Sequence, residues 1–248
     1  MVKKILIKDD NFKIDEEIVA CIGFFDGLHL GHQELVNKAI AEANKLGLKS
    51  ALICFNPDPV EIISKKKNNH IFSNRERENL IRSFGIDVFI VISFDEKMMK
   101  MDPIDFINDY LNRMNIKELV SGFDFSFGYM GKGNNKLLKK YGNFKSIVIP
   151  EHKHYGKKIS STRIKEELTK GNLKLVNKLL GFNYYLNLKI EKSSKNEDKW
   201  LIEAINNDSN IIKIKDGQYD CFEVVGNRYY FISDKKYKKG DVIKYYVY

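Results

Sequence analysis

The chain has 248 residues, of which 43% are hydrophobic and 30% are charged, and its formal net charge is +9. This composition is typical of a globular protein with one core, or with one core and a small second domain. No apolar run approaches the roughly 18–20 residues of a membrane-spanning helix, and the apolar stretch near the N-terminus is too short for a signal peptide. We therefore expect a cytoplasmic protein that does not enter a membrane.

The positive charge favours anionic partners. Lysine and asparagine are spread over the whole chain and form no basic arm, so we expect a phosphorylated small molecule rather than nucleic acid as the ligand. The three cysteines Cys21, Cys54 and Cys221 are far apart and include no CxxC pair, which argues against a disulfide framework or a zinc site. We expect buried thiols. The oligomeric state is not predicted.

The first 150 residues alternate short apolar runs with helical patterns. The runs that favour buried parallel strands cover residues 18–24, 50–55, 86–92, 117–121 and 144–149. The helical patterns cover residues 35–46, 73–84, 102–114 and 136–141. A capping box marks the start of the second of these helices and Asp102-Pro103 the start of the third. This alternation predicts an α/β fold, a parallel sheet with helices on both faces.

The pattern changes in the last third of the chain. Two helices are predicted at residues 160–170 and 172–180, separated by Gly171. Short β-branched or aromatic runs follow at residues 185–190, 200–205, 211–214, 219–225, 229–232 and 242–247. We therefore predict two domains, an α/β domain at residues 1–182 and a small all-β domain at residues 183–248.

The segment GFFDGLHLGH, residues 23–32, follows the first predicted buried strand. His29 and His32 are three residues apart and share one face at the start of a helix, where free backbone N–H groups bind anions. Gly31 removes a side chain where a ligand could approach, and Asp26 is expected to shape the turn. A zinc pair and ordinary surface histidines are the alternatives, but no third zinc ligand lies nearby in the sequence. The segment therefore indicates a site for nucleotide phosphates.

Two further segments follow strands at the same edge of the predicted sheet, where ligands of such folds bind. They are residues 56–59 and 122–133. Further on, Ser160 or Ser161 can cap a helix, and Arg163 adds a fixed positive charge. This favours a second phosphate site, with a plain capped surface helix as the alternative.

Four blocks of the sequence carry a specific resemblance. They are GFFDGLHLGHQ (residues 23–33), FNPDP (55–59), GFDFSFG (122–128) and ISSTRIK (159–165). In this order they resemble the bacterial FAD synthetase family of the HxGH nucleotidylyltransferase superfamily, over about residues 18–182. The resemblance implies a Rossmann-like domain that transfers AMP from ATP to FMN, giving FAD and pyrophosphate, with Mg²⁺ accompanying ATP.

The resemblance also implies roles for individual residues. The catalytic residues would be His29, His32 and Arg163. The remaining ATP contacts would come from Gly23, Phe24, Phe25, Asp26, Gly31, Ser160, Ser161, Thr162 and Lys165. The flavin contacts would come from Asn56, Asp124, Phe125, Phe127 and Tyr129, although core packing is the alternative for each phenylalanine.

The sequence departs from the family pattern at a few positions. Asp58 stands where histidine is usual and Lys165 where arginine is usual, and the usual arginine and aspartate near Gly131 and Asn134 are absent. Lysine keeps the charge but loses the bidentate fork. Two alternatives therefore stay open: a nucleotidylyltransferase with another phosphate acceptor, and a degenerate, non-catalytic module that binds flavin or nucleotide.

The C-terminal region also differs from the family pattern. Members usually carry a riboflavin kinase domain with a glycine-led PTAN segment, and no such segment follows Gly181. Residues 183–248 are expected to be either a reduced relative of that barrel or an unrelated β appendage, and we expect no riboflavin kinase activity.

Overall fold

The computed structural model describes residues 2–196, 199–206, 222–225, 228–233 and 235–246. The chain divides into two compact units. The first unit comprises residues 1–68 and 75–159, and the second comprises residues 69–74 and 160–248. The domain boundary at residue 182 stays a prediction; in the structure the residues between 160 and 182 belong to the second unit.

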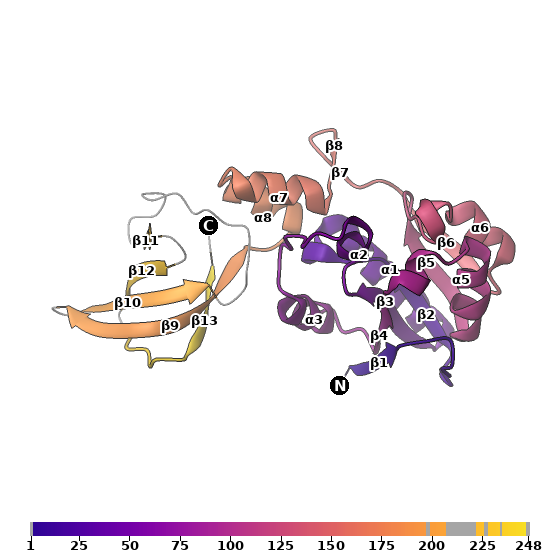
Figure 1. Cartoon of the computed structure of the whole chain (residues 1–248), viewed down its shortest axis with the longest axis horizontal. Helices are drawn as coiled ribbons and strands as arrows, with labels where there is room; N and C mark the ends of the chain where they lie inside the picture. The colour runs from indigo at the N-terminus through magenta and orange to yellow at the C-terminus, as the bar shows by residue number, and fades with distance from the viewer. Residues whose placement is uncertain (1, 197–198, 207–221, 226–227, 234, 247–248) are drawn as a thin grey trace. The chain divides into compact units, whose positions relative to one another are not determined.

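The first unit is built on a six-stranded sheet in which every neighbouring pair is parallel (Figure 1). In sheet order the strands are β1 (Lys3–Ile7), β4 (Val88–Ser93), β3 (Lys49–Asn56), β2 (Ile18–Ile22), β5 (Ile116–Gly122) and β6 (Lys145–Ile149). The predicted α/β class is thus confirmed. The edge strand β1 was not predicted, because its sequence, KKILI, offers only a short apolar run.

Helices connect the strands of this sheet. They are α1 (Leu30–Leu46), α2 (Pro59–Ser64), α3 (Asn74–Ser83), α4 (Glu96–Met99), α5 (Pro103–Asp109) and α6 (Asn135–Tyr141). Asp102 caps α5 as predicted, its side chain accepting a hydrogen bond from the Ile104 N–H. The helix predicted to reach residue 114 ends at Asp109 and continues as a 3₁₀ turn, η2 (Leu111–Arg113). Helices α2 and α4 were not predicted, because four to six residues are too few to show a helical period.

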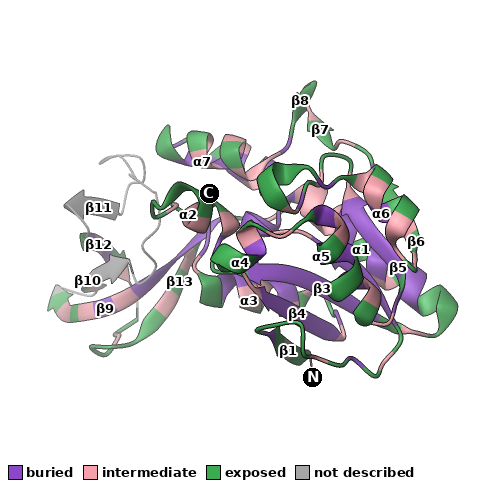
Figure 2. Ribbon diagram, turned by 45° about the vertical axis from the view of Figure 1, so that its right-hand side comes forward, coloured by how far each residue is buried: buried purple, intermediate pink, exposed green. Residues whose placement is uncertain are grey.

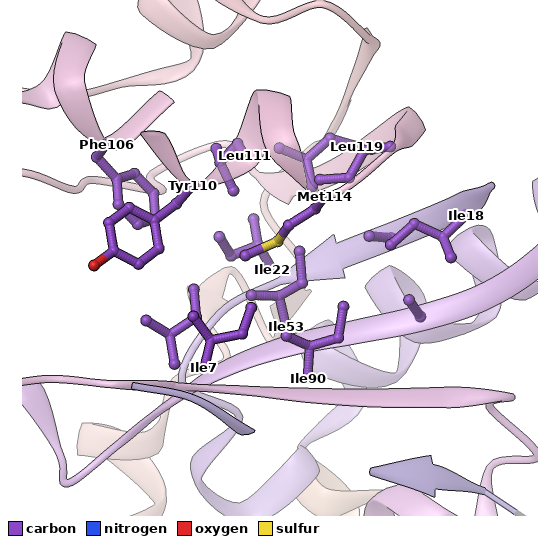
Figure 3. Packing of buried hydrophobic residues seen from close by; sticks show 14 of the residues in the cluster. Ile7, Ile18, Ile22, Ile53, Ile90, Phe106, Tyr110, Leu111, Met114 and Leu119 are labelled. Atoms are coloured by element: carbon purple, nitrogen blue, oxygen red, sulfur yellow. The ribbon is translucent and has the colours of Figure 1, made fainter. Parts of the chain in front are cut away.

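Apolar side chains pack on both faces of the sheet, and Figure 2 shows the strands β3, β4 and β5 as buried along most of their length. Successive residues of a strand point to opposite faces, so Ile18, Ala20 and Ile22 of β2 pack in one cluster, and Val19 and Cys21 in the other. Figure 3 shows the first cluster, in which isoleucines of the strands contact side chains from α5, from η2 and from Met114, which follows η2. Burial on both faces explains the unbroken apolar runs in the sequence.

The second unit combines two helices with a five-stranded antiparallel sheet. Its elements are α7 (Ser161–Thr169), α8 (Leu173–Leu180), β9 (Tyr185–Asn196), β10 (Lys199–Asn206), β11 (Phe222–Val225), β12 (Arg228–Ser233) and β13 (Val242–Tyr246). These agree with the predicted all-β character of the C-terminal region. The strand predicted at 211–214, residues 219–221 of the next predicted strand, and Cys221 lie outside the described residues.

A short segment from the middle of the chain completes the second unit. Phe72 stacks on Phe182 and Tyr184, with ring centroids 6.1 and 5.2 Å away, and lies 5.1 Å from Tyr185. The hydroxyl of Tyr184, which is fully buried, donates a hydrogen bond to the Ile71 carbonyl at 3.2 Å. Residues 69–74 therefore belong to the core of this unit although they precede it by about ninety positions.

Cys21 and Cys54 are free and buried, as expected, and burial raises the pKa of both thiols, that of Cys54 to about 12. These thiols are consequently unreactive at neutral pH. Among the described residues, no helix combines the length and the apolarity that crossing a membrane requires.

Candidate active site

The sheet changes winding direction between β2 and β5. From β2 the chain proceeds to β3 and β4 on one side, whereas β5 and β6 lie on the other side. In open α/β sheets, ligands bind beyond the carboxyl ends of the strands at this switch point. Two segments leave the sheet there: residues 23–32 after β2, called here the histidine turn, and residues 123–133 after β5, called here the β5 loop.

The backbone of the histidine turn is held in an unusual conformation. It passes through a 3₁₀ turn, η1 (Asp26–Leu28), and both Phe25 (φ 59°) and Leu28 (φ 45°) adopt left-handed conformations. This region is unfavourable for residues with a large side chain. The side chains of Phe25 and Leu28 are fully buried, so packing holds the turn in place.

His29 and His32 are brought together where α1 begins. Their rings stack with centroids 3.8 Å apart and planes inclined by 14°. His29 caps the helix, its Nδ1 accepting a hydrogen bond from the His32 backbone N–H at 3.3 Å. Because Nδ1 is an acceptor, a neutral His29 ring carries its proton on Nε2. The sequence-based prediction that the two histidines share one face is confirmed.

Both histidines are neutral at pH 7. Burial lowers the pKa of His29 to about 4; Asp26 opposes this shift, and Lys158 and His152 add to it. Burial and the neighbouring His29 hold the pKa of His32 well below 6.5. The Nδ1 atom of His32 is inaccessible to solvent and has no hydrogen-bond partner among the described residues. The pair therefore offers neutral N–H donors beside a helix N-terminus, which suits phosphate oxygens.

Gly31 allows the rings to lie over the start of α1. A Cβ atom at this position would lie 3.4 Å from the Cε1 and Nδ1 atoms of His29 and 3.7 Å from the Cβ of His152. These contacts are tight, and a longer side chain would have to displace His29 or His152. The close contacts around this position thus explain why the HxGH pattern has a glycine here.

A segment between β6 and α7 lies against the histidine turn. This segment, residues 150–158, is called here the strap; it contains the short strands β7 (Lys153–His154) and β8 (Lys157–Lys158). His152 pairs with Glu34 of α1 at 2.9 Å. Lys158 pairs with Asp124 of the β5 loop and lies 5.0 Å from the ring centroid of Phe123. The strap therefore contacts both α1, next to the histidine turn, and the β5 loop.

An apolar cavity of about 240 Å³ opens beside the β5 loop. Its walls come from the end of β3, from helices α2, α4 and α5, and from the β5 loop; it is called here the aromatic pocket. It is lined by Phe55, Pro59, Ile63, Phe94, Met98, Phe106, Ser126, Phe127, Gly128 and Gly131. Such walls suit a flat, largely apolar ring system with a few polar groups at its edge.

Gly128 is required for the shape of this pocket. Its φ is +70°, and a Cβ atom there would lie 2.7 Å from the Cγ of Pro103, the first residue of α5. A side chain would therefore be strained and would clash with the proline ring. The glycine lets the β5 loop close against α5.

The predicted flavin residues are only partly brought together. Phe127 is buried and lines the aromatic pocket, and Phe125 stacks on it with centroids 5.5 Å apart. Asn56 ends β3, and its carbonyl accepts a hydrogen bond from the Phe94 N–H. Asp124 pairs with Lys158, and Tyr129 is 45% exposed; neither lines the pocket.

Sequence reasoning missed most of the pocket. Three of the missed residues are aromatic, and each comes from a different segment: Phe55, Phe94 and Phe106. In the sequence they read as core positions, and two of them, Phe55 and Phe106, are indeed buried in the core cluster. Only the three-dimensional arrangement shows that these rings also face a cavity.

Two positions that depart from the family pattern have local structural roles. Asp58 is 4% exposed and caps α2: its carboxylate accepts hydrogen bonds from the Val60 N–H at 2.9 Å and from the Asn68 side-chain amide at 2.7 Å. Asn134 caps α6 in a similar way. The carboxylate of Asp58 therefore makes hydrogen bonds within its own loop.

The ISST block forms a capped helix, as predicted. Ser160 is the N-cap of α7, its hydroxyl accepting a hydrogen bond from the Arg163 N–H at 3.3 Å. Ser161, Arg163 and Lys165 are half-buried, and Thr162 is exposed. This block belongs to the second unit, whereas the histidine turn belongs to the first.

The residues that the structure describes contain no group of three or more histidine, cysteine or carboxylate side chains that could hold a metal ion. The stacked histidines face each other rather than a common ligand position.

Comparison with known proteins assigns the chain to a family. The FAD synthetase family model matches residues 11–163. Proteins named bifunctional riboflavin kinase/FMN adenylyltransferase are similar: that of Listeria monocytogenes is 33% identical over 170 residues, 67% of this chain and 54% of its own length. That of Buchnera aphidicola is 36% identical over 176 residues, 68% of this chain and 56% of its own length. The chain thus spans about half the length of these relatives.

A solved structure covers nearly the whole chain. The crystal structure of a Streptococcus pneumoniae protein named macrolide-efflux protein matches 99% of this chain and 90% of its own, with a TM-score of 0.85 and 25% identity. The family match includes the histidine turn, the β5 loop and the strap, and it reaches Arg163. The chain therefore belongs to the FAD synthetase family.

Proposed function

We propose that this protein transfers AMP from ATP to FMN, forming FAD and pyrophosphate. An oxygen of the FMN phosphate attacks the α-phosphorus of ATP, a new P–O bond forms, and the bond to the pyrophosphate leaving group breaks. The observation that carries the proposal is the desolvated His29–His32 pair at the start of α1, in the same unit as an aromatic pocket at the same edge of the sheet.

The histidine turn supplies the nucleotide end of this reaction. Neutral His29 has its Nε2–H available for a phosphate oxygen, and the N-terminus of α1 adds backbone N–H groups. Such donors stabilise the charge that develops on the oxygens in the transition state. Mg²⁺, bound by the ATP phosphates and water, would neutralise part of that charge. We assign Gly23, Phe24, Phe25 and Asp26 to the same nucleotide contact surface.

The aromatic pocket is assigned to the flavin ring. Its walls combine aromatic faces with polar atoms of Ser126 and the β5-loop backbone, which suits a ring that is apolar on its faces and polar at its edge. Among the residues predicted from sequence, Phe127 and Phe125 belong to this wall or support it. Asp124 and Lys158, at the start of the β5 loop and the end of the strap, are assigned to the phosphate side.

The capped helix α7 is assigned a second phosphate contact through Ser160, Ser161, Thr162 and Arg163, with Lys165 one turn further on. Its support is the N-cap geometry at Ser160, because the first turn of a helix presents backbone N–H groups that attract anions. Riboflavin phosphorylation is not part of the proposal, because the sequence has no glycine-led PTAN segment after Gly181.

The test is incubation of the full chain with ATP, Mg²⁺ and FMN, followed by chromatographic separation of flavins and measurement of pyrophosphate. We expect FAD and pyrophosphate in equal amounts. Parallel reactions with riboflavin, and with other phosphomonoesters in place of FMN, define the acceptor. Nucleotide binding without pyrophosphate release would contradict the proposal and favour a non-catalytic module. Adenylylation of another phosphomonoester in preference to FMN would contradict the acceptor assignment.

A further inference from the structure

A buried arginine on α3 lies outside every motif discussed so far. Arg77 is 6% exposed, which is unusual for a charged side chain. Its guanidinium contacts one residue of the histidine turn, Phe24: an N–H group donates to the Phe24 carbonyl at 3.4 Å, and the guanidinium carbon lies 4.5 Å from the centroid of the Phe24 ring. A planar guanidinium is suited to such combined stacking and hydrogen bonding.

Phe24 immediately precedes the strained part of the turn. The peptide whose carbonyl Arg77 contacts leads directly into Phe25, which is left-handed at φ 59°. The ring of Phe25 lies 5.2 Å from that of His32, which stacks on His29 at 3.8 Å. A continuous series of contacts therefore runs from Arg77 through Phe24 and Phe25 to the histidine pair.

We propose that Arg77 is a positioning residue for adenylyl transfer: it holds the Phe24 peptide and ring, and so fixes the left-handed turn that aligns His32 with His29. This inference rests on the proposed function. A backbone that is unfavourable for phenylalanine persists only when surrounding contacts determine it, and Arg77 supplies two of them. The positioning of catalytic groups is sensitive to displacements of about 1 Å.

The kinetic test compares Arg77→Met with a matched variant on the same helix, Arg82→Met. Arg82 also links α3 to another segment, donating to the Val2 carbonyl at 3.1 Å, and it pairs with Glu78 of its own helix at 2.8 Å. These contacts do not include the histidine turn. We expect Arg77→Met to lower kcat at least about 10-fold and to leave the KM for FMN within about twofold. Arg82→Met should lower the melting temperature comparably and leave kcat unchanged. An equal loss of kcat in both variants, or none in Arg77→Met, would overturn the inference.

A second measurement does not depend on activity. NMR signals of the His29 and His32 rings, recorded without substrates, should shift in Arg77→Met and stay in place in Arg82→Met; unmoved signals in both variants would overturn the inference. If the wild-type chain forms no FAD, the proposed function fails while the ring signals still decide whether Arg77 positions the pair. If Arg77→Met does not fold, Arg77→Lys serves in both measurements. It keeps the charge but loses the planar group, and should show a smaller loss of kcat and the same ring shifts.

Discussion

The histidine turn and the aromatic pocket lie at the same edge of one sheet but are built in opposite ways. The turn is a run of ten consecutive residues whose strained backbone and stacked imidazoles are fixed by near neighbours. The pocket gathers side chains from β3, α2, α4, α5 and the β5 loop, and its walls are largely apolar. The proposed function assigns the phosphate charge to the compact turn and recognition of the acceptor to the distributed pocket.

The two regions should also respond differently to their surroundings. Desolvation controls the protonation of the turn, so its properties depend on pH. The walls of the pocket are largely apolar, and apolar contact changes little with pH. Variants that separate these responses test the comparison directly.

The largest effect is expected from truncation of the histidine pair. His29→Ala and His32→Ala each remove an N–H donor to the transition state, which should lower kcat about 100- to 1,000-fold. The KM for FMN should change little, because neither residue lines the aromatic pocket. His154→Ala, on the β7–β8 hairpin, is the control and should retain activity. Similar losses in all three variants would show that the effect is not specific to the histidine turn.

The pH dependence of stability offers a second test. The folded-state pKa of His29, about 4, lies below the ordinary value of 6.5, so between these values the unfolded chain binds the proton more strongly. Stability should therefore fall as the pH is lowered from 6.5 towards 4, by up to about 3 kcal/mol from this residue. Urea unfolding at pH 7 and pH 5 measures the change. His29→Asn should flatten the dependence, and an equally steep fall in that variant would locate the effect elsewhere.

Filling the aromatic pocket should affect the acceptor alone. Ser126 is exposed and lines the pocket, so Ser126→Trp places a large ring at its wall without disturbing the core. We expect the KM for FMN to rise about 10-fold while the KM for ATP and the melting temperature stay near wild type. Ser126→Ala is the matched control. A rise in the KM for ATP of the same size would show that the pocket is not separate from the nucleotide site.

The smallest effect is expected at Asp58, the residue whose charge departs from the family pattern. Because its carboxylate caps α2, Asp58→Ala should lower the free energy of unfolding by about 1 kcal/mol. The same change at Asp102, which caps α5, should have a similar effect in chemical denaturation. Both variants should keep the KM for ATP within about twofold. A marked fall in that KM for Asp58→Ala alone would show that the charge does act on the nucleotide.

Much of the fold was visible in the sequence, because strands buried on both faces leave unbroken apolar runs and longer helices leave a clear period. The interior strands β2, β3, β4 and β5 and the edge strand β6 were all predicted. What escaped were elements of six residues or fewer: the edge strand β1 and the helices α2 and α4. Their conformation is decided by neighbours distant in sequence, which a local pattern does not record.

In the candidate site, too, local features were predicted and features that depend on distant residues were not. The shared face of His29 and His32 and a serine cap at residue 160 or 161 follow from spacing within one turn of helix, and both were predicted. The stacking of the two rings was not. Phe94, Phe106 and Arg77 act through partners far away in the sequence, and no local signal distinguishes them from core or surface residues. Lys158 likewise acquires its role only when the strap meets the β5 loop.

The position of residues 69–74 has a consequence for how the chain can be divided. Because this segment belongs to the second unit, the backbone passes between the units three times, around residues 68, 74 and 159. A fragment that begins at residue 160 would lack Phe72 and the carbonyl acceptor of Tyr184. An isolated second unit would therefore need the 69–74 segment supplied as a separate peptide or joined by a linker, and limited proteolysis between residues 68 and 75 should release neither unit intact.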